Sequence, residues 1–548
     1  MATQLPPLYY LTHFASVIDW ITARYNDLLR PDDHHFITQF KQLSADTQAL
    51  LVRFVIRRQE PLRWSSFTYA EITHTALALK QLVALDLVDN NPMLTADQLI
   101  RLAKKEELLA APWAHAFSKS TAKSVIADWL MSEPSQTQSW SDWLPNADDQ
   151  IVMFRDHARM DRFRLLFFGN LYQDWSEFVV TDLGHQRYER VPFDMSSRPF
   201  QHERDVTLVH RLFDIGIRTQ QGEDPALLFD ELTHDIGDVP EFLVARRQKR
   251  LFQLGAAAER IQNWPLALSI YETTNYPGKT YRTVRVCEKL AHFEQAYRLA
   301  NDALSGVLRD EERQQLQRAL PRLAKKVGQT IPAKPSTLII NEAILELSAA
   351  PSRCVEVSAC EALTTEARSV HYVENTLLCG LFGLLFWEVI FAPIPGAFFN
   401  PYQRGPADLF HPDFVTRRRS LINECFEQLD GMNYSDQILN TWYQKYSLQN
   451  PFVIWPALNE ELLQKALSVI PAQHLKLIFQ RMLDDLRHHT SGLPDLIAFD
   501  ISSEGTRYQM IEVKGPNDRL QDNQVRWFEF FAHYGIPTQV LHVQWPSP

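Results

Sequence analysis

The sequence has few cysteines, and their spacing disfavours two classes of protein. Five cysteines stand in 548 residues, at positions 287, 354, 360, 379 and 425, and none forms a CxxC pair. A disulfide framework and a cysteine-ligated zinc site are therefore disfavoured, and reduced thiols in a cytosol are expected. The first residues, "MATQLPPLYYLTHF", also lack a basic segment followed by an apolar run. We therefore expect no secretory signal and a cytoplasmic protein.

One apolar run stands out, "LLCGLFGLLFWEVIFAPIPGAFF" at residues 377–399. Glu388 lies in its middle, and Pro393 and Pro395 interrupt it. Its helical part, residues 377–392, is shorter than the roughly 20 residues that cross a bilayer. We predict a buried helix here and no association with a membrane.

Basic residues are outnumbered by acidic ones. The 55 lysines and arginines face 66 aspartates and glutamates, which gives a net charge of −11. Binding to a phosphate-rich partner would therefore depend on local clusters rather than on the total charge. Such clusters occur as "VRFVIRR" (52–58), "RDHARMDRFR" (155–164), "ARRQKR" (245–250) and "TRRRS" (416–420). A solvated surface is the commoner explanation of each cluster taken alone.

The length predicts a multidomain protein, and the patterns predict mostly α-helix before the C-terminal region. Residues 1–90 read as helices with aromatic cores. Residues 91–135 read as two short amphipathic helices joined by a polar loop, and Thr95 with Gln98 forms a capping box that would start the first helix. A looser stretch at 131–150 favours a linker, so we assign 136–204 to a linker and further helices.

A weak internal repeat marks residues 205–345. "ERIQNWPLALSIY", from Glu259, recurs as "EKLAHFEQAYRLA", from Glu288. An aromatic residue followed three positions later by alanine is typical of helices that pack closely in a solenoid. With two copies visible, coincidence between two amphipathic helices stays an alternative.

The pattern changes to strands after residue 493. "LPDLIAFD" and "RYQMIEVKG" predict two strands of a hairpin joined by "ISSEGT". Asn517 or Asp518 is expected to cap a helix that runs to Tyr534, and "TQVLHVQW" predicts another strand. The order strand, strand, helix, strand predicts a small mixed sheet, and we assign 346–548 to this α/β domain.

Charged residues in these strands form a candidate metal site. Side chains alternate along a strand, so Glu512 and Lys514 lie on one face, and Asp495 can lie beside them. Two converging carboxylates repel each other unless a cation lies between them, and Mg²⁺ or Mn²⁺ prefers such oxygen ligands. With Lys514 placed to hold or deprotonate a water, the pattern favours hydrolysis of a phosphodiester. Gln524 lies on the buried face of the helix and points to the same edge. A surface ion pair and a turn aspartate are the alternatives.

"GLPDLIAF", "IEVKGPNDRL" and "QVRW" together resemble the VRR-NUC branch of the PD-(D/E)xK nucleases, and in particular the bacterial Fanconi-associated nuclease family. "ENTLLCGLFGLLFWEVIF" resembles that family's segment with an extra catalytic glutamate, here Glu374. The N-terminal helices, the helix pair and the repeat resemble its N-terminal, SAP and TPR regions. The resemblance implies Glu374, Asp495, Glu512 and the Val513 carbonyl as metal ligands, Lys514 as the water-activating group and Gln524 as the helix glutamine.

The same resemblance implies a function. Family members are Mg²⁺- or Mn²⁺-dependent nucleases that cut near 5′ flaps or branched junctions and degrade DNA 5′ to 3′ in interstrand crosslink repair. We accordingly expect an enzyme bound to branched duplex DNA, associated with the nucleoid if the source is a bacterium. The DNA contacts are expected from Arg53, Arg57, Arg58, Lys119, Lys123, Arg417, Arg418 and Arg419. The alternative is a non-catalytic DNA-binding scaffold that recruits protein partners through the TPR-like helices.

Overall fold

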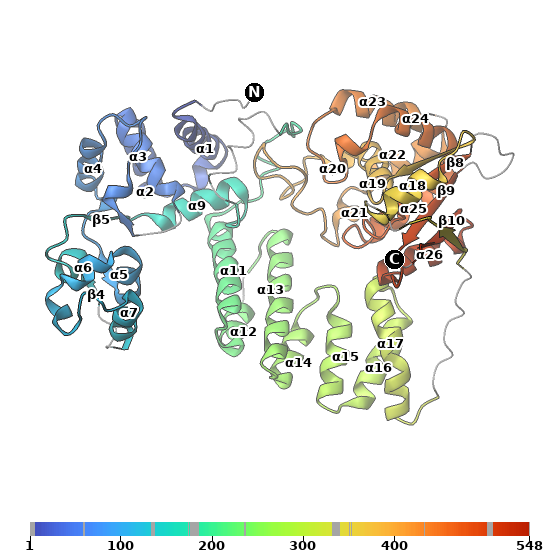
Figure 1. Cartoon of the computed structure of the whole chain (residues 1–548), viewed down its shortest axis with the longest axis horizontal. Helices are drawn as coiled ribbons and strands as arrows, with labels where there is room; N and C mark the ends of the chain where they lie inside the picture. The colour runs from blue at the N-terminus through green and yellow to red at the C-terminus, as the bar shows by residue number, and fades with distance from the viewer. Residues whose placement is uncertain are drawn as a thin grey trace. The chain divides into compact units, whose positions relative to one another are not determined.

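The structure is a computed structural model, and it separates into two compact units (Figure 1). The first contains residues 1–186 and 200–210, and the second contains 187–199 and 211–548. The described residues are 6–57, 61–132, 137–173, 175, 186–234, 237–330, 340–349, 351, 353–431, 433–500 and 508–546. The hairpin loop "ISSEGT" and Arg58 lie outside them. Helices dominate both units, and the largest sheet belongs to the C-terminal region, which confirms the predicted fold class.

The first unit has a helical core rich in aromatic residues. It contains α1 (Tyr9–Tyr25), α2 (Pro31–Gln42), α3 (Ala45–Ile56), α4 (Thr75–Ala84) and α9 (His157–Phe168). Phe14 packs edge-on against Phe40, and Phe36 contacts Phe163, so α1, α2 and α9 share one core. The short strands β1 (Leu62–Arg63), β5 (Ile151–Phe154) and β2 (Val88–Asp89) pair antiparallel beside it.

Residues 93–144 form a second core in this unit. It is built from β3 (Met93–Thr95), α5 (Ala96–Leu102), α6 (Lys105–Leu109), α7 (Lys123–Ser132), β4 (Thr137–Ser139) and α8 (Trp140–Trp143). The predicted capping box is present, with Thr95 and Gln98 each accepting the other's backbone N–H. The prediction of a linker at 131–150 is wrong for its middle part, because Trp140 and Trp143 are buried in the same core as Leu99 and Ile126.

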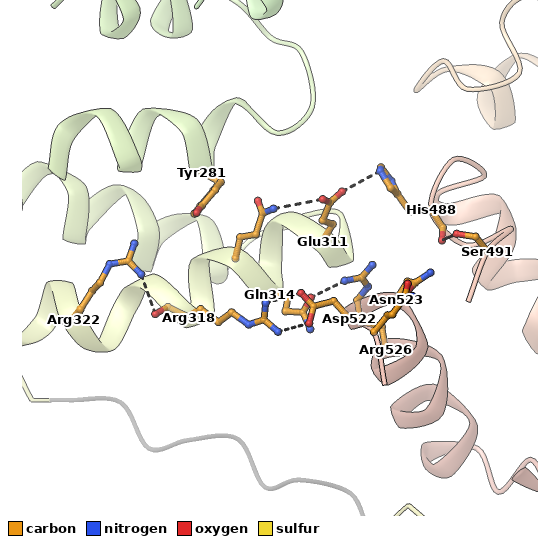
Figure 2. Close-up of a pocket in the computed structure, with 12 residues that line it drawn as sticks. Tyr281, Glu311, Gln314, Arg318, Arg322, His488, Ser491, Asp522, Asn523 and Arg526 are labelled. Carbon is orange, nitrogen blue, oxygen red and sulfur yellow. Dashed lines mark hydrogen bonds and ion pairs between the residues drawn. The ribbon is translucent and has the colours of Figure 1, made fainter. Parts of the chain in front are cut away.

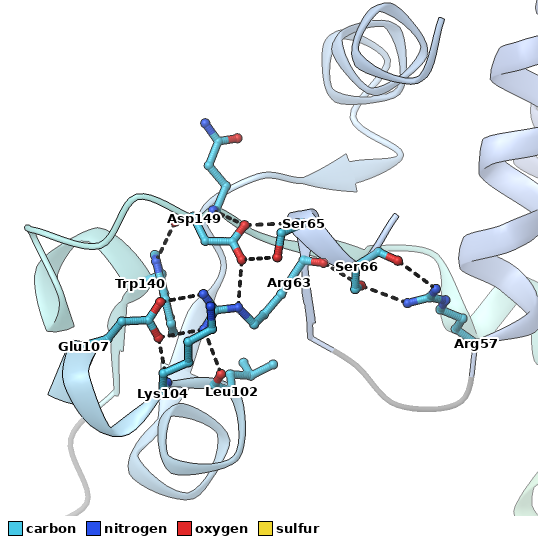
Figure 3. A network of polar contacts seen from close by, with 10 residues as sticks. Arg57, Arg63, Ser65, Ser66, Leu102, Lys104, Glu107, Trp140 and Asp149 are labelled. Atoms are coloured by element: carbon cyan, nitrogen blue, oxygen red, sulfur yellow. Dashed lines mark hydrogen bonds and ion pairs between the residues drawn. The ribbon is translucent and has the colours of Figure 1, made fainter. Parts of the chain in front are cut away.

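A partly buried polar network ties this second core to the strand β1 (Figure 3). Arg63 donates to Asp149 at 2.7 Å, to Glu107 at 2.7 Å and to the carbonyl of Leu102 at 3.0 Å. The hydrogen bond from Arg63 lowers the pKa of Glu107, although partial burial opposes it. Because its guanidinium binds both carboxylates, Arg63 fixes the packing of β1 against the second core.

The second unit contains a row of helices that follows α11 (Figure 1). Helix α11 (Glu203–Gln221) starts in the first unit and ends in the second, and after it come α12 (Pro225–Thr233), α13 (Glu241–Arg260), α14 (Trp264–Thr273), α15 (Lys279–Lys289), α16 (Phe293–Leu304) and α17 (Asp310–Lys326). The internal repeat of the sequence is also a repeat of the structure. Trp264 and Phe293 open α14 and α16, and Ala267 and Ala296 are fully buried.

The turns before these two helices repeat as well. Gln262 and Ala291 both adopt positive φ, 60° and 59°, at equivalent positions. The ammonium of Lys289 lies over the ring of Trp264, and that of Lys326 lies over Phe293. The sequence similarity therefore reflects two copies of one helix-pair geometry.

The C-terminal sheet has five strands in the order β6-β10-β9-β8-β7. They are β6 (Glu342–Glu346), β7 (Arg368–Tyr372), β8 (Leu496–Asp500), β9 (Tyr508–Lys514) and β10 (Thr538–Gln544). Strands β8 and β9 are antiparallel, as predicted, and β10 runs parallel to β9. The sequence did not indicate β7, which pairs antiparallel with β8, or β6, which pairs parallel with β10 and starts before the predicted boundary at 346.

Helices cover both faces of this sheet. Helix α18 (Val355–Leu363) packs on one face against Val370, Ile511 and Val513. The other face packs on a large core from α19 (Thr376–Leu385), α20 (Trp387–Ile390), α21 (Phe414–Arg417), α22 (Arg419–Asp430), α23 (Tyr434–Lys445), α24 (Glu460–Val469), α25 (Ala472–Asp484) and α26 (Asp522–His533). Every residue of α19 after the first is buried, which confirms the predicted buried helix. Among the described residues, no helix has the length and apolar character needed to span a membrane.

Helix α26 starts later than predicted. Asn517 adopts a positive φ of 68°, and the Asp518 carboxylate accepts the backbone N–H of Gly515 at 3.2 Å. Both residues therefore close a turn, as short polar side chains do, and neither caps the helix. The cap is Gln521, whose backbone N–H donates to the Gln524 side chain at 2.9 Å.

Candidate active site

Asp495 is fixed at the start of β8 by the segment that carries Glu374. The backbone N–H groups of Val373 and Glu374 both donate to the Asp495 carbonyl at 2.8 Å. The Asp495 side chain accepts the backbone N–H of Val513 on β9 at 2.9 Å. The segment around Glu374, the residue before β8 and strand β9 therefore meet here.

Glu374 has an unusual backbone conformation. Its φ is 36°, in the left-handed region that residues other than glycine rarely adopt. Its carboxylate accepts from the Tyr372 hydroxyl at 2.7 Å and from the Asn375 amide at 3.3 Å. Backbone conformations of this kind concentrate at functional sites, where surrounding bonds hold them.

Glu512, Lys514 and Gln524 form one connected group. Glu512 is 1% exposed, and its Oε1 lies 2.7 Å from the Lys514 ammonium. The Gln524 amide donates to the same oxygen, and its carbonyl oxygen accepts from Lys514 at 3.1 Å. The predicted placement of Glu512 and Lys514 on one face of β9, with Gln524 of α26 beside them, agrees with these contacts.

The site is short of positive charge. Burial raises the pKa of Glu512 to about 8, and the neighbouring Asp495 carboxylate raises it further. Burial also raises the pKa of Asp495 to about 6, against the opposing Val513 N–H and Lys514. Within the described part of the chain, Glu512 Oε2 is buried without a hydrogen-bond donor. One buried and one partly buried carboxylate with a single cationic side chain beside them favour a bound cation.

The donor chemistry fits a hard divalent ion. Carboxylate oxygens and a backbone carbonyl are the ligands that Mg²⁺ and Mn²⁺ prefer, and the orphaned Oε2 of Glu512 is one such oxygen. As the side chains stand, no three histidine, cysteine or acidic residues of the described ranges are arranged to hold a metal. The structure brings Asp495 and Glu512 together, while the Glu374 carboxylate faces Tyr372. A chain with this PD-(D/E)xK set is expected to depend on a divalent metal.

Sequence reasoning missed three residues around this group. Tyr372 and Asn375 hold the Glu374 carboxylate, and Asn375 also accepts the backbone N–H of Leu493 at 3.2 Å. Glu356, on α18, adds negative charge that raises the pKa of Asp495. The stretch "HYVEN" carries two of the three within two positions of Glu374, and that spacing is the signal that was available.

The predicted DNA-contact residues occupy different environments. Lys119 and Arg419 are exposed. Arg53 pairs with Glu71, Arg57 donates to Ser66 at 3.0 Å, and Lys123 donates to the carbonyl of Ala103 at 2.7 Å. Intramolecular partners of this kind compete with phosphate contacts.

Arg417 and Arg418 are bound within the protein. Arg417 lies 2.9 Å from Asp408, and Arg418 donates to both Asp408 oxygens at 2.8 and 2.9 Å and to the Val389 carbonyl at 3.0 Å. The Arg418 side chain has no exposed surface. The expectation that Arg418 contacts DNA is therefore wrong, because its guanidinium neutralises a buried carboxylate.

Replacing Arg418 by methionine is expected to lower the free energy of unfolding by about 3 kcal/mol, because Asp408 loses its bidentate partner in a buried setting. Urea-induced unfolding measures this change. The matched control is Arg419→Met at the next position, whose exposed side chain should change stability by less than about 0.5 kcal/mol. Equal effects of the two substitutions would contradict the structural role of Arg418.

Comparison with known protein families matches two parts of the chain. The VRR-NUC domain family matches residues 432–545, which include Asp495, Glu512, Lys514 and Gln524. The family described as "FAN1, HTH domain" matches residues 8–89. The two matches lie at opposite ends of the sequence.

Similarity to known proteins extends over the whole chain. A Fanconi-associated nuclease 1 homolog of Pseudomonas aeruginosa is 40% identical over 543 residues, which cover 98% of this chain and 96% of that protein. The human Fanconi-associated nuclease 1 is 30% identical over 175 residues, which cover 31% of this chain and 17% of that protein. A crystal structure of paFAN1 bound to DNA with a 2-nucleotide 5′ flap and a gap superposes with a TM-score of 0.90, at 40% identity and with both chains fully covered. The chain belongs to the Fanconi-associated nuclease family.

Proposed function

We propose that this nuclease hydrolyses phosphodiester bonds near 5′ flaps or branched junctions, as an endonuclease and a 5′-to-3′ exonuclease, in the repair of interstrand crosslinks. The observation that carries the proposal is the full-length similarity, with a TM-score of 0.90, to a protein crystallised on 5′-flap DNA. The partly buried Asp495 and the buried Glu512 and Lys514 supply the matching chemistry.

The proposed metal ligands are Glu374, Asp495, Glu512 and the Val513 carbonyl, and the proposed ion is Mn²⁺ or Mg²⁺. When bound, such an ion supplies stabilisation of negative charge on the phosphate oxygens. The Glu374 carboxylate would leave the Tyr372 hydroxyl to join this set. The hydrogen bond from the Glu374 backbone N–H to the Asp495 carbonyl, at 2.8 Å, would keep the two residues together while the side chain turns.

Lys514 is proposed to hold the attacking water. An ammonium group has three donors, and Glu512 and Gln524 accept two of them in this structure. The third is available to a water or a phosphate oxygen. Gln524 fixes the direction of this donor because it contacts Lys514 and Glu512 at once.

The N-terminal domain (1–90) and the SAP-like pair (91–135) are proposed to grip duplex DNA, and the exposed Lys119 and Arg419 are the proposed phosphate contacts that the fold leaves accessible. The segment 136–204 would link these to the TPR-like region (205–345) and to the nuclease domain (346–548). A non-catalytic scaffold is less well supported, because a decayed site would have lost one of the acidic or basic positions, and all are present.

The test is cleavage of a labelled 5′-flap duplex with Mn²⁺ or Mg²⁺, next to nicked, forked and plain duplexes. The wild type is expected to cut near the flap and to stop when the metal is chelated. Asp495→Ala should cut about a thousandfold more slowly or worse, because a metal ligand is lost. The matched control is Asp500→Ala, at the other end of β8, which should cut at the wild-type rate. Equal cutting by Asp495→Ala and wild type would refute the site, and equal cutting of all four substrates would refute the structure specificity.

A further inference from the structure

Helix α17 of the helical repeat contacts the nuclease domain through polar side chains (Figure 2). Arg318 makes two parallel hydrogen bonds to Asp522, at 2.7 and 2.6 Å. Asp522 is the first residue of α26, which carries Gln524 one half-turn further on. The two partners are 204 positions apart in the sequence, so the contact joins two regions of the fold.

Three more contacts join the same two regions. Arg526, on α26, donates to Gln314 at 2.6 Å. Glu311 lies 3.0 Å from His488 in the segment after α25, and Asp310 lies 2.8 Å from Arg481 on α25.

Arg481 continues this connection into α26. Its guanidinium lies over the rings of Trp527 and Phe530, and it donates to the carbonyl of Arg526 at 3.3 Å. Residues of one face of α17 therefore hold α26 on both sides of Gln524.

Polar side chains, rather than an apolar core, lie between α17 and the start of α26. A cavity of about 690 Å³ lies between α17 and the start of α26, and polar side chains line most of it. Arg318 and Asp522 remain 57% and 55% exposed. An ion pair so exposed adds little to global stability, so its effect is expected on the local position of the helix start.

Gln524 is sensitive to that position. Its carbonyl oxygen accepts from the backbone of Gln521 and from Lys514, and its amide donates to Glu512. A shift at the start of α26 would therefore change the contacts of both catalytic side chains. Displacements well under 1 Å at such contacts are enough to slow chemistry.

We propose that Arg318 is a positioning residue: by holding Asp522 it fixes the start of α26, and with it Gln524, against Glu512 and Lys514. The helical repeat thereby sets the geometry of the catalytic group. This inference rests on the proposed function for its kinetic consequence, while its structural consequence does not depend on cleavage.

The test compares Arg318→Glu with the charge-swapped double variant Arg318→Glu/Asp522→Arg. Glutamate at 318 places like charges together, so kcat on the 5′-flap duplex should fall about fivefold, with KM and metal-free DNA affinity within about twofold of wild type. The double variant should recover most of the lost rate. Amide hydrogen exchange in a peptide covering residues 521–530 should be faster in the single variant and recover in the double.

Arg322→Glu is the matched control. Arg322 lines the same cavity on α17, but it pairs with Glu288 of α15 at 2.8 Å and donates to the backbone carbonyl of Arg318 at 3.3 Å (Figure 2). Among the described residues, no hydrogen bond or ion pair joins its side chain to α26. It should leave both kcat and the exchange of residues 521–530 unchanged. The proposal would be overturned if Arg318→Glu left kcat unchanged, or if the double variant failed to recover the lost kcat. It would also be overturned if Arg318→Glu and Arg322→Glu lost DNA affinity alike. If the wild type cuts no flap, the proposed function fails, and hydrogen exchange alone then decides whether Arg318 fixes α26.

Discussion

Replacing Glu512 by glutamine is expected to lower kcat on a 5′-flap duplex by about a thousandfold. Glutamine keeps the size of the side chain and one oxygen for Lys514, but it loses the charge that a divalent ion requires at this buried position. DNA affinity measured without metal should stay within about twofold of wild type, because removal of a negative charge does not weaken phosphate binding. Single-turnover cleavage and a metal-free binding titration measure the two quantities.

The matched control for this substitution is Glu361→Gln on α18, a residue whose side chain is 68% exposed in an ion pair with Arg353. It should leave cleavage unchanged, since exposed pairs contribute little. Retention of more than about a tenth of the wild-type rate by Glu512→Gln would show that the charge of Glu512 is not needed for the reaction.

The metal-free protein is expected to lose stability as pH rises, and Mn²⁺ should restore it. Burial raises the pKa of Asp495 from 3.8 to about 6 and that of Glu512 from 4.5 to about 8. Both pKa values are higher in the folded state than in the unfolded state. At a pH between the unfolded and the folded pKa of each group, the folded protein therefore binds more protons than the unfolded protein. The free energy of unfolding therefore falls from about pH 4 to pH 6 through Asp495 and up to about pH 8 through Glu512.

Mn²⁺ binds the deprotonated oxygens, so its stabilisation should grow in the opposite direction. At about 100 times its dissociation constant it should add about 3 kcal/mol at pH 8 and much less near pH 5, read as the shift of the unfolding midpoint. The control is the double variant Asp495→Asn/Glu512→Gln, which should show neither the pH dependence nor the Mn²⁺ shift. An equal Mn²⁺ shift at both pH values, or the same shift in the double variant, would place the binding elsewhere.

Some of the site was predictable because its geometry is local. Asp495 directly precedes β8 and Glu512 lies on β9, the antiparallel strand that follows β8 in the sequence, and the period of two along β9 puts Glu512 and Lys514 on one face. Glu374 was found only by resemblance. Its place next to Asp495 depends on the pairing of β7 with β8, which brings together segments about 120 residues apart.

Other features depended on partners that the local sequence does not reveal. Arg418 reads as one of three solvated arginines until the fold brings Asp408 and the Val389 carbonyl around it. Strand β6 was missed because its alternation "EAILE" places glutamates on an exposed edge. The start of α26 was misplaced because Asn517 takes a left-handed conformation and Asp518 closes a turn, so the usual capping residues serve the loop.

The most direct measurement is the anomalous diffraction of Mn²⁺ in crystals of the metal-loaded protein. If these residues hold a divalent ion, we expect a peak at about 2 Å from oxygens of Asp495, Glu512 and Val513. The Glu374 carboxylate should have turned from Tyr372 toward the ion. The peak should vanish in crystals of Asp495→Ala. A wild-type protein that cuts flap DNA in Mn²⁺ yet shows no peak among these oxygens would contradict the metal site.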